Sequence, residues 1–315
     1  ELTATLAEPP AAPQLMTTRG FVDFFVHGRF RSALSNFTQA IASYRAVVGR
    51  AGFELDTVSM FCCWALYYLG EIGELSRRVP AMVEAATRNG NRYTAVTLRC
   101  AFPIAWLARL EPDAIEAEID AALSSWTTAD GSCQLQHLFA LSSRLDLALY
   151  RRRPEDATPR IASEWKQIRR SLVDRPPLQG LVLRSTLLRH AVACANQAPP
   201  GSSRRREALA EARAYLRSIP HRSVPVIVYC VKMFEGLIAE AEGRPEDAIV
   251  RYRAALPGLS ADIHLFENAV RDRLGRLIGG DEGAQLQADV RRWLAEEQVR
   301  DPETMLAMLL PGPQR

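Results

Sequence analysis

Helix-breaking residues recur along the whole chain at short and fairly even intervals. They separate segments of roughly 15–20 residues, each with apolar side chains at i, i+3, i+4 and i+7. That spacing places the apolar side chains on one side of a helix, whereas no stretch of strand length alternates with period two. The pattern predicts an all-α chain of about seven helical hairpins between Leu15 and Ala295, followed by a short helix near residues 302–309. Among the turn signals are Gly28, Gly70–Gly73, Asn89-Gly90-Asn91, Gly243-Arg244-Pro245 and Pro257-Gly258.

The length of 315 residues fits either two globular domains or one elongated array of helical pairs. Ala, Leu, Arg and Glu dominate the composition, which favours helices in either case. Residues 1–14 contain three prolines and begin with Glu1 rather than Met, so we expect a linker or disordered lead in a piece of a larger protein. Residues 15–310 are expected to form the helical domain.

One segment matches the spacing of a tetratricopeptide repeat. Small residues lie where two such helices cross, because larger side chains would push the helices apart. Pro245 and the acids after it suit the first turn of the second helix. The matching positions are Gly236, Gly243, Ala248, Tyr252, Ala255 and Leu256.

A second segment repeats the later half of this pattern, with Phe21 in place of the small residue of the first helix. Its matching positions are Gly28, Phe30, Ala33, Phe37, Ala40 and Ile41. The other pairs are longer and more degenerate. Together these segments predict an α-α superhelix, a tetratricopeptide-like solenoid.

Several short motifs resemble the C-terminal helical region of large bacterial serine/threonine protein kinases. The motifs are the stretch 70–80, Leu135-Gln136-His137, Leu149-Tyr150, the stretch 301–305 and Leu310-Pro311-Gly312. In that family a kinase domain is often followed by an ATPase domain and a tetratricopeptide-like array. The resemblance implies a cytoplasmic sensory or scaffolding region of a signalling protein, and the family's catalytic residues lie outside the matching part.

Charge, hydropathy and cysteine usage exclude several functional classes. A net charge of +3, from 39 basic and 36 acidic residues, gives no general attraction for nucleic acid. The most apolar stretch, Met60 to Leu69, is too short to span a membrane. The six cysteines show no metal-ligand spacing and suit a reducing cytosol. We therefore expect a cytoplasmic protein with no nucleic-acid or membrane partner.

Signatures of catalysis are absent from the sequence. It has no phosphate-binding loop, no HRD or DFG, no HExxH and no GxSxG. The five histidines lack a second ligand at metal-binding spacing. The sequence therefore predicts a chain without enzymatic activity, cofactor or metal of its own.

Two sets of side chains are candidates for a binding groove. Arg92, Arg99 and Trp106 are spaced by seven residues, as are His137, Arg144 and Arg151, so each set is expected on one face of one helix. Inward-facing, they would form a basic stripe able to clamp an acidic peptide or a terminal carboxylate. The alternative is that they lie on solvated or convex faces and bridge Asp and Glu of neighbouring helices.

Two functions remain open, together with a purely structural or oligomerisation role. The first is a non-catalytic module that binds a protein or peptide, or another domain of its parent chain, on a concave groove. The second is a ligand-sensing domain that binds a small molecule or peptide signal and controls an attached kinase or ATPase domain. A deep pocket lined by Arg99, His137 and Arg144 would favour sensing. The tryptophans interpreted as core rather than ligand platform are Trp64, Trp126, Trp165 and Trp293.

Overall fold

The computed structural model describes residues 11–46, 52–108, 112–126, 132–220 and 224–313, and within these ranges it contains helices and no β-strand. The all-α prediction is confirmed. The helices are, in chain order, α2 (Ala11–Val22), the π-helix η1 (Asp23–His27), α3 (Phe30–Ala46), α4 (Gly52–Leu69), α5 (Ile72–Arg88), α6 (Arg92–Ala101), α7 (Pro103–Leu107), α8 (Pro112–Ser124), α9 (Leu135–Tyr150), the 3-10 helix η2 (Pro154–Ala157), α10 (Thr158–Ser171), α11 (Pro177–Gln197), α12 (Ser203–Ser218), α13 (Pro225–Ala241), α14 (Pro245–Asp262), α15 (His264–Ile278), α16 (Gly280–Glu296) and α17 (Pro302–Leu309).

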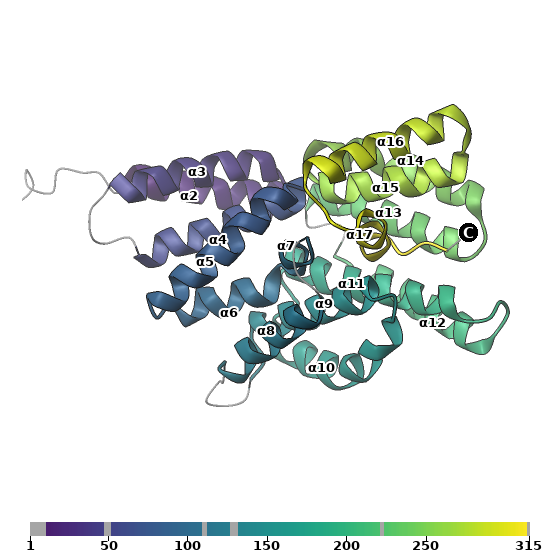
Figure 1. Cartoon of the computed structure of the whole chain (residues 1–315), viewed down its shortest axis with the longest axis horizontal. Helices are drawn as coiled ribbons and strands as arrows, with labels where there is room; N and C mark the ends of the chain where they lie inside the picture. The colour runs from purple at the N-terminus through teal and green to yellow at the C-terminus, as the bar shows by residue number, and fades with distance from the viewer. Residues whose placement is uncertain (1–10, 47–51, 109–111, 127–131, 221–223, 314–315) are drawn as a thin grey trace, which may run out of the picture.

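Consecutive helices pack as hairpins, as Figure 1 shows for α2 with α3, α11 with α12, α13 with α14 and α15 with α16. Helix α2 begins at Ala11, ahead of the expected domain start at Leu15, because a proline such as Pro13 is tolerated in the first helical turn. The rest of the expected lead, residues 1–10, lies outside the described residues. In the described ranges no helix is long and apolar enough to cross a membrane.

The hairpin α13–α14 has the close helix crossing that its small residues predict. A Cβ atom on Gly236 would lie 2.7 Å from the ring of Tyr252, which is fully buried. Gly243 turns the chain with a φ of 77°, a conformation that favours glycine, and Pro245 occupies the first turn of α14. The predicted helix–turn–helix unit is therefore confirmed.

The first hairpin differs from the prediction by one residue. The small residue at the crossing is Gly20, not Phe21, since a Cβ on Gly20 would lie 2.4 Å from the ring of Phe37. Gly20 precedes the turn at Gly28 by eight positions, whereas Gly236 precedes Gly243 by seven. The π-helix η1 absorbs the additional residue, because its wider turn holds one residue more than an α-helical turn.

One predicted turn is a close packing site instead. Pro257-Gly258 lies inside α14, which continues to Asp262. A Cβ on Gly258 would lie 2.0 Å from the ring of Tyr229 on α13. The glycine therefore provides room for an aromatic ring of the neighbouring helix, and it does not end helix α14.

The first hairpins also contact the last ones. Helix α4 packs against α15, and Figure 1 shows the purple and blue N-terminal helices meeting the yellow-green C-terminal ones. Hydrogen bonds join these regions: for example, the amide of Gly73 donates to Glu297 Oε2 at 2.7 Å, and the amide of Arg31 donates to Asp262 Oδ1 at 2.8 Å. The chain thus curves back on itself, with α9 and α11 packed together between its two ends.

Candidate functional site

Helix α8 neutralises most of the predicted basic stripe. It packs against α6, which carries Arg99, and against α9, which carries Arg144 and ends one residue before Arg151. The ion pairs with its acids are Arg99 with Glu118 (3.2 Å), Arg144 with Asp120, and Arg151 with Asp113 and Glu116 (2.6 Å each). Arg144 is only 8% exposed and also lies 3.6 Å from Glu164 of α10. These three arginines therefore bridge acids of neighbouring helices, as the alternative interpretation describes.

The remaining predicted groove residues do not join them in one site. Pro103 ends the helix that was expected to continue, so Trp106 lies on α7 and not on a shared face with Arg92 and Arg99 on α6. The expected common face is wrong for that reason. Trp106 is half-buried against the core, and Arg92 is exposed. His137 caps α9, its Nδ1 accepting the amide N–H of Gln134 at 3.1 Å.

A different site lies where η1, α4, α6, α9 and α11 meet around a half-open apolar pocket of about 420 Å³, here called the outer chamber. Its walls are mainly aromatic rings, and the largely exposed Phe53 and the partly exposed Tyr93 lie at its rim. Other wall residues are Phe24, Phe25, Phe61, Trp64, Tyr68, Phe139 and Val182.

The aromatic wall follows from the sequence of α4. Phe61, Trp64 and Tyr68 are spaced by three and four residues, so one face of the helix carries all three rings. Trp64 lies with its ring centre 5.0 Å from that of Phe139 on α9. Trp64 is therefore both core, as predicted, and part of a cavity wall, which the sequence interpretation did not assign to it.

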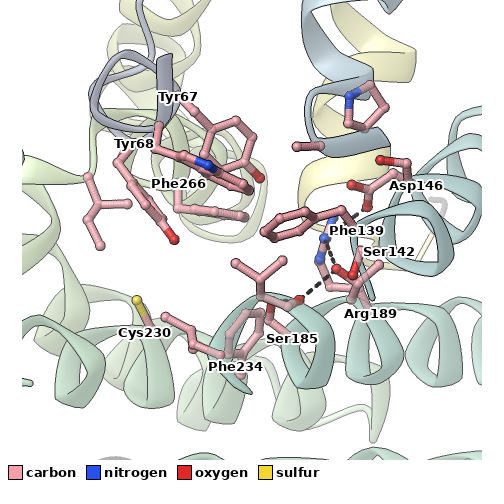
Figure 2. Close-up of a pocket in the computed structure, with 18 of the residues that line it drawn as sticks. Tyr67, Tyr68, Phe139, Ser142, Asp146, Ser185, Arg189, Cys230, Phe234 and Phe266 are labelled. Carbon is pink, nitrogen blue, oxygen red and sulfur yellow. Dashed lines mark hydrogen bonds and ion pairs between the residues drawn. The ribbon is translucent and has the colours of Figure 1, made fainter. Parts of the chain in front are cut away.

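A smaller and more polar cavity adjoins the first. This inner chamber has a volume of about 40 Å³ and shares Trp64, Tyr68, Phe139 and Val182 with the outer chamber. A single layer of side chains thus separates the two. Figure 2 shows Asp146, Ser142 and Arg189 on one side of the inner chamber, opposite the rings of Tyr67, Tyr68 and Phe266.

Asp146 and Arg189 form an ion pair inside the fold. Arg189 is 2% exposed, and its Nη2 lies 2.9 Å from Asp146 Oδ1 and donates a hydrogen bond to Thr186 Oγ1 at 3.0 Å. Its Nη1 donates to the carbonyl oxygen of Met308 on α17 at 2.9 Å. Burial raises the pKa of Asp146, and the positive charge of Arg189 opposes that shift. The pair connects the inner chamber to the C-terminal helix.

Three atoms of residues that line the inner chamber are buried without a hydrogen bond. They are Ser142 Oγ, Arg189 Nε and Asp146 Oδ1, and the last of these lies in charge contact with Arg189 Nη2 at 2.9 Å. Cys230 also lines the chamber, and burial raises the pKa of its thiol to about 12, which keeps it protonated at neutral pH. The chamber therefore offers hydrogen-bonding groups rather than an activated thiol nucleophile.

The sequence contains a signal for this pair that the motif search missed. Asp146 stands between Leu145 and Leu147, and Arg189 follows Leu187-Leu188, so each charge interrupts an apolar helical stretch. Charged residues in such stretches are buried only when they are paired. Periodicity alone, however, does not indicate that the two stretches face each other.

In the described part of the chain, no three His, Cys, Asp or Glu side chains come together in a cluster that could hold a metal ion. Comparison of the chain with protein-family models, with curated proteins and with solved structures found no match.

Proposed function

We propose that this chain is a ligand-sensing helical domain that binds an apolar small molecule in the outer chamber. The observation that carries the proposal is the cavity of about 420 Å³ with aromatic walls and a rim at Phe53 and Tyr93. Protein interiors are normally close-packed, whereas ligand pockets have about 300–1,000 Å³ and mostly apolar linings. The outer chamber has both properties of a ligand pocket.

The peptide-groove hypothesis has less support. Arg99, Arg144 and Arg151 already contact acids of α8, so an acidic peptide would have to displace these intramolecular partners. Charge reversal at Arg144 would also disturb folding, because the side chain is 8% exposed. We propose that a protein partner, including another domain of the parent chain, receives the ligand signal. The ligand itself is a different molecule.

Our proposal for the finer architecture is a superhelix of tetratricopeptide-like hairpins in a cytoplasmic bacterial signalling protein, next to a kinase or ATPase domain. The close crossings at Gly236 and Gly20 support the hairpin type. The contacts between α4 and α15 support a curvature strong enough to enclose a cavity. Ligand binding would then alter the packing between hairpins, which is how a sensor of this kind would signal.

Titration with N-phenyl-1-naphthylamine, an uncharged dye that fluoresces in apolar surroundings, tests the proposal. The dye should bind the unmodified chain saturably. Val182→Trp should abolish this binding, because the larger indole side chain would occupy space in the outer chamber that Val182 borders. The matched control is Val250→Trp, the same substitution at a side chain 64% exposed on α14. Absence of saturable binding, or equal binding by the Val182 variant, would refute the proposed site.

A further inference from the structure

Two neighbouring polar side chains of α9 line the inner chamber with atoms that make no hydrogen bond. Ser142 and Asp146 are four residues apart on α9, so their side chains lie on one face, one turn apart. They are 5% and 7% exposed, and Ser142 Oγ and Asp146 Oδ1 have no hydrogen-bond partner. Buried polar atoms of this kind are normally satisfied by protein, water or ligand.

The facing helix α11 supplies one charge contact, from Arg189 Nη2 to Asp146 Oδ1 at 2.9 Å, while its hydroxyl groups are engaged elsewhere. Ser185 Oγ donates to the carbonyl oxygen of Val182 at 2.9 Å, and Thr186 Oγ1 donates to the same oxygen. Arg189 donates to Thr186 and to Met308. The positions left open are thus an acceptor on Asp146, a hydroxyl on Ser142 and the Nε donor of Arg189.

The size of the inner chamber limits what can occupy it. A cavity needs a volume of about 10–15 Å³ to hold one water molecule, and the inner chamber has about 40 Å³. A hydroxyl or a primary amide fits, whereas a ring or a second alkyl chain does not. The body of a larger ligand would remain among the aromatic rings of the outer chamber.

Charge narrows the choice of head group further. Asp146 and Arg189 already neutralise each other at 2.9 Å. A carboxylate would bring a second negative charge beside Asp146, and an ammonium group a second positive charge beside Arg189, and both would lose their hydration. An uncharged head that donates to Asp146 and exchanges a hydrogen bond with Ser142 avoids these penalties.

We infer that the ligand is an elongated apolar molecule with an uncharged hydrogen-bonding head, a hydroxyl or an amide. Its body occupies the outer chamber, and its head passes Val182, the smallest of the four shared wall residues, to reach Ser142 and Asp146. This inference rests on the proposed function, since it requires a ligand in the outer chamber.

Displacement of the naphthylamine dye by ligands of equal chain length tests the head group. Decanol and decanamide should displace the dye at concentrations at least about tenfold lower than decanoate or decylammonium at neutral pH. Greater hydrophobicity of the alcohol would give the same order, so variants must separate the two causes. Asp146→Asn leaves Arg189 without its counter-charge. It should therefore raise the affinity for decanoate, relative to that for decanol, by about tenfold or more.

Asp247→Asn is the matched control, because it makes the same substitution at an exposed carboxylate on α14. It should change the affinity for neither ligand. Dye affinity and circular dichroism report whether each variant keeps the outer chamber and the fold. If Asp146→Asn does not fold, Ser142→Ala replaces it. That variant should weaken the binding of decanol severalfold and leave the binding of decanoate unchanged.

The possible outcomes distinguish the two proposals. Dye binding that is abolished by Val182→Trp, together with head-group preferences unaffected by Asp146→Asn and Ser142→Ala, would overturn the inference and leave the proposed function standing. The inner chamber would then hold water only. Absence of dye binding to the unmodified chain would overturn both proposals.

Discussion

Replacement of Arg189 by methionine removes the positive charge that faces Asp146 inside the helical bundle. Methionine is similar in length and apolar, so the change keeps much of the volume but removes the charge and the hydrogen bonds to Thr186 and to the carbonyl oxygen of Met308. In the unmodified chain the two side chains are 2% and 10% exposed and 2.9 Å apart. Removing one member of a buried pair leaves the other charge uncompensated in a region with little water.

The loss expected from this change is large. Breaking a buried ion pair from one side destabilises proteins by about 3–5 kcal/mol. Most domains have a free energy of unfolding of about 5–15 kcal/mol, so Arg189→Met should fold but unfold at a clearly lower urea concentration. Arg88→Met is the control, since Arg88 and Glu84 form an exposed helical pair for which we expect about 0.3–0.5 kcal/mol.

The pH dependence identifies the charge responsible. Burial raises the pKa of Asp146 and Arg189 opposes this, so the variant should have an Asp146 pKa raised further. A carboxyl with a raised folded-state pKa binds its proton more tightly when folded. Its stabilising contribution is present at low pH and lost as the pH rises through that pKa. The deficit of the Arg189 variant should therefore be greatest at neutral pH and shrink in acid.

Urea unfolding, monitored by circular dichroism at neutral and mildly acid pH, checks both the size of the loss and its dependence on pH. Addition of Asp146→Asn to Arg189→Met should recover part of the loss at neutral pH, because the amide carries no charge. A loss below about 1 kcal/mol, or a deficit that does not depend on pH, would refute the assignment of a buried, mutually dependent pair.

Two further predictions concern packing and pH. Gly236→Val should lower the free energy of unfolding by about 1–3 kcal/mol, because its side chain would meet the ring of Tyr252. Gly52→Ala, with no atom within 4 Å, should not lower it, and equal urea midpoints for the two variants would contradict the close crossing. Burial lowers the pKa of His190, which hydrogen-bonds the carbonyl oxygen of Pro154, so stability should fall as the pH drops from the ordinary value of 6.5 through the lowered one. His190→Gln should flatten that pH profile, and an unchanged profile would exclude His190 as its cause.

Local patterns predicted the helices and one complete hairpin. The positions of Gly236, Gly243 and Tyr252 indicated both the crossing and the turn of α13–α14, because close approach and a positive φ each require glycine at one place. The spacing of Arg92, Arg99 and Trp106 predicted one helix face, whereas Pro103 separates α6 from α7, since proline cannot continue the hydrogen-bond ladder. The same local rules were misleading at Pro257-Gly258, where the glycine accommodates Tyr229.

The candidate site could be predicted only in part. The spacing of Phe61, Trp64 and Tyr68 indicates an aromatic helix face, but not that the face borders a cavity. The stripe of arginines was identifiable as basic, yet its partners on α8 depend on how that helix packs across α6 and α9. Side-chain charge is visible in a sequence, whereas its neutralisation by a distant segment is not.

The sequence by itself determined the all-helical character, the main helix boundaries and the tight α13–α14 turn, because these depend on interactions within a few residues. Tertiary structure alone decided that α4 meets α15, that Asp146 faces Arg189, and that two chambers remain between α4, α9 and α11. Those features depend on the crossing angles of successive hairpins. Each angle is set by many weak contacts, and small differences accumulate along the chain until they decide which distant helices touch.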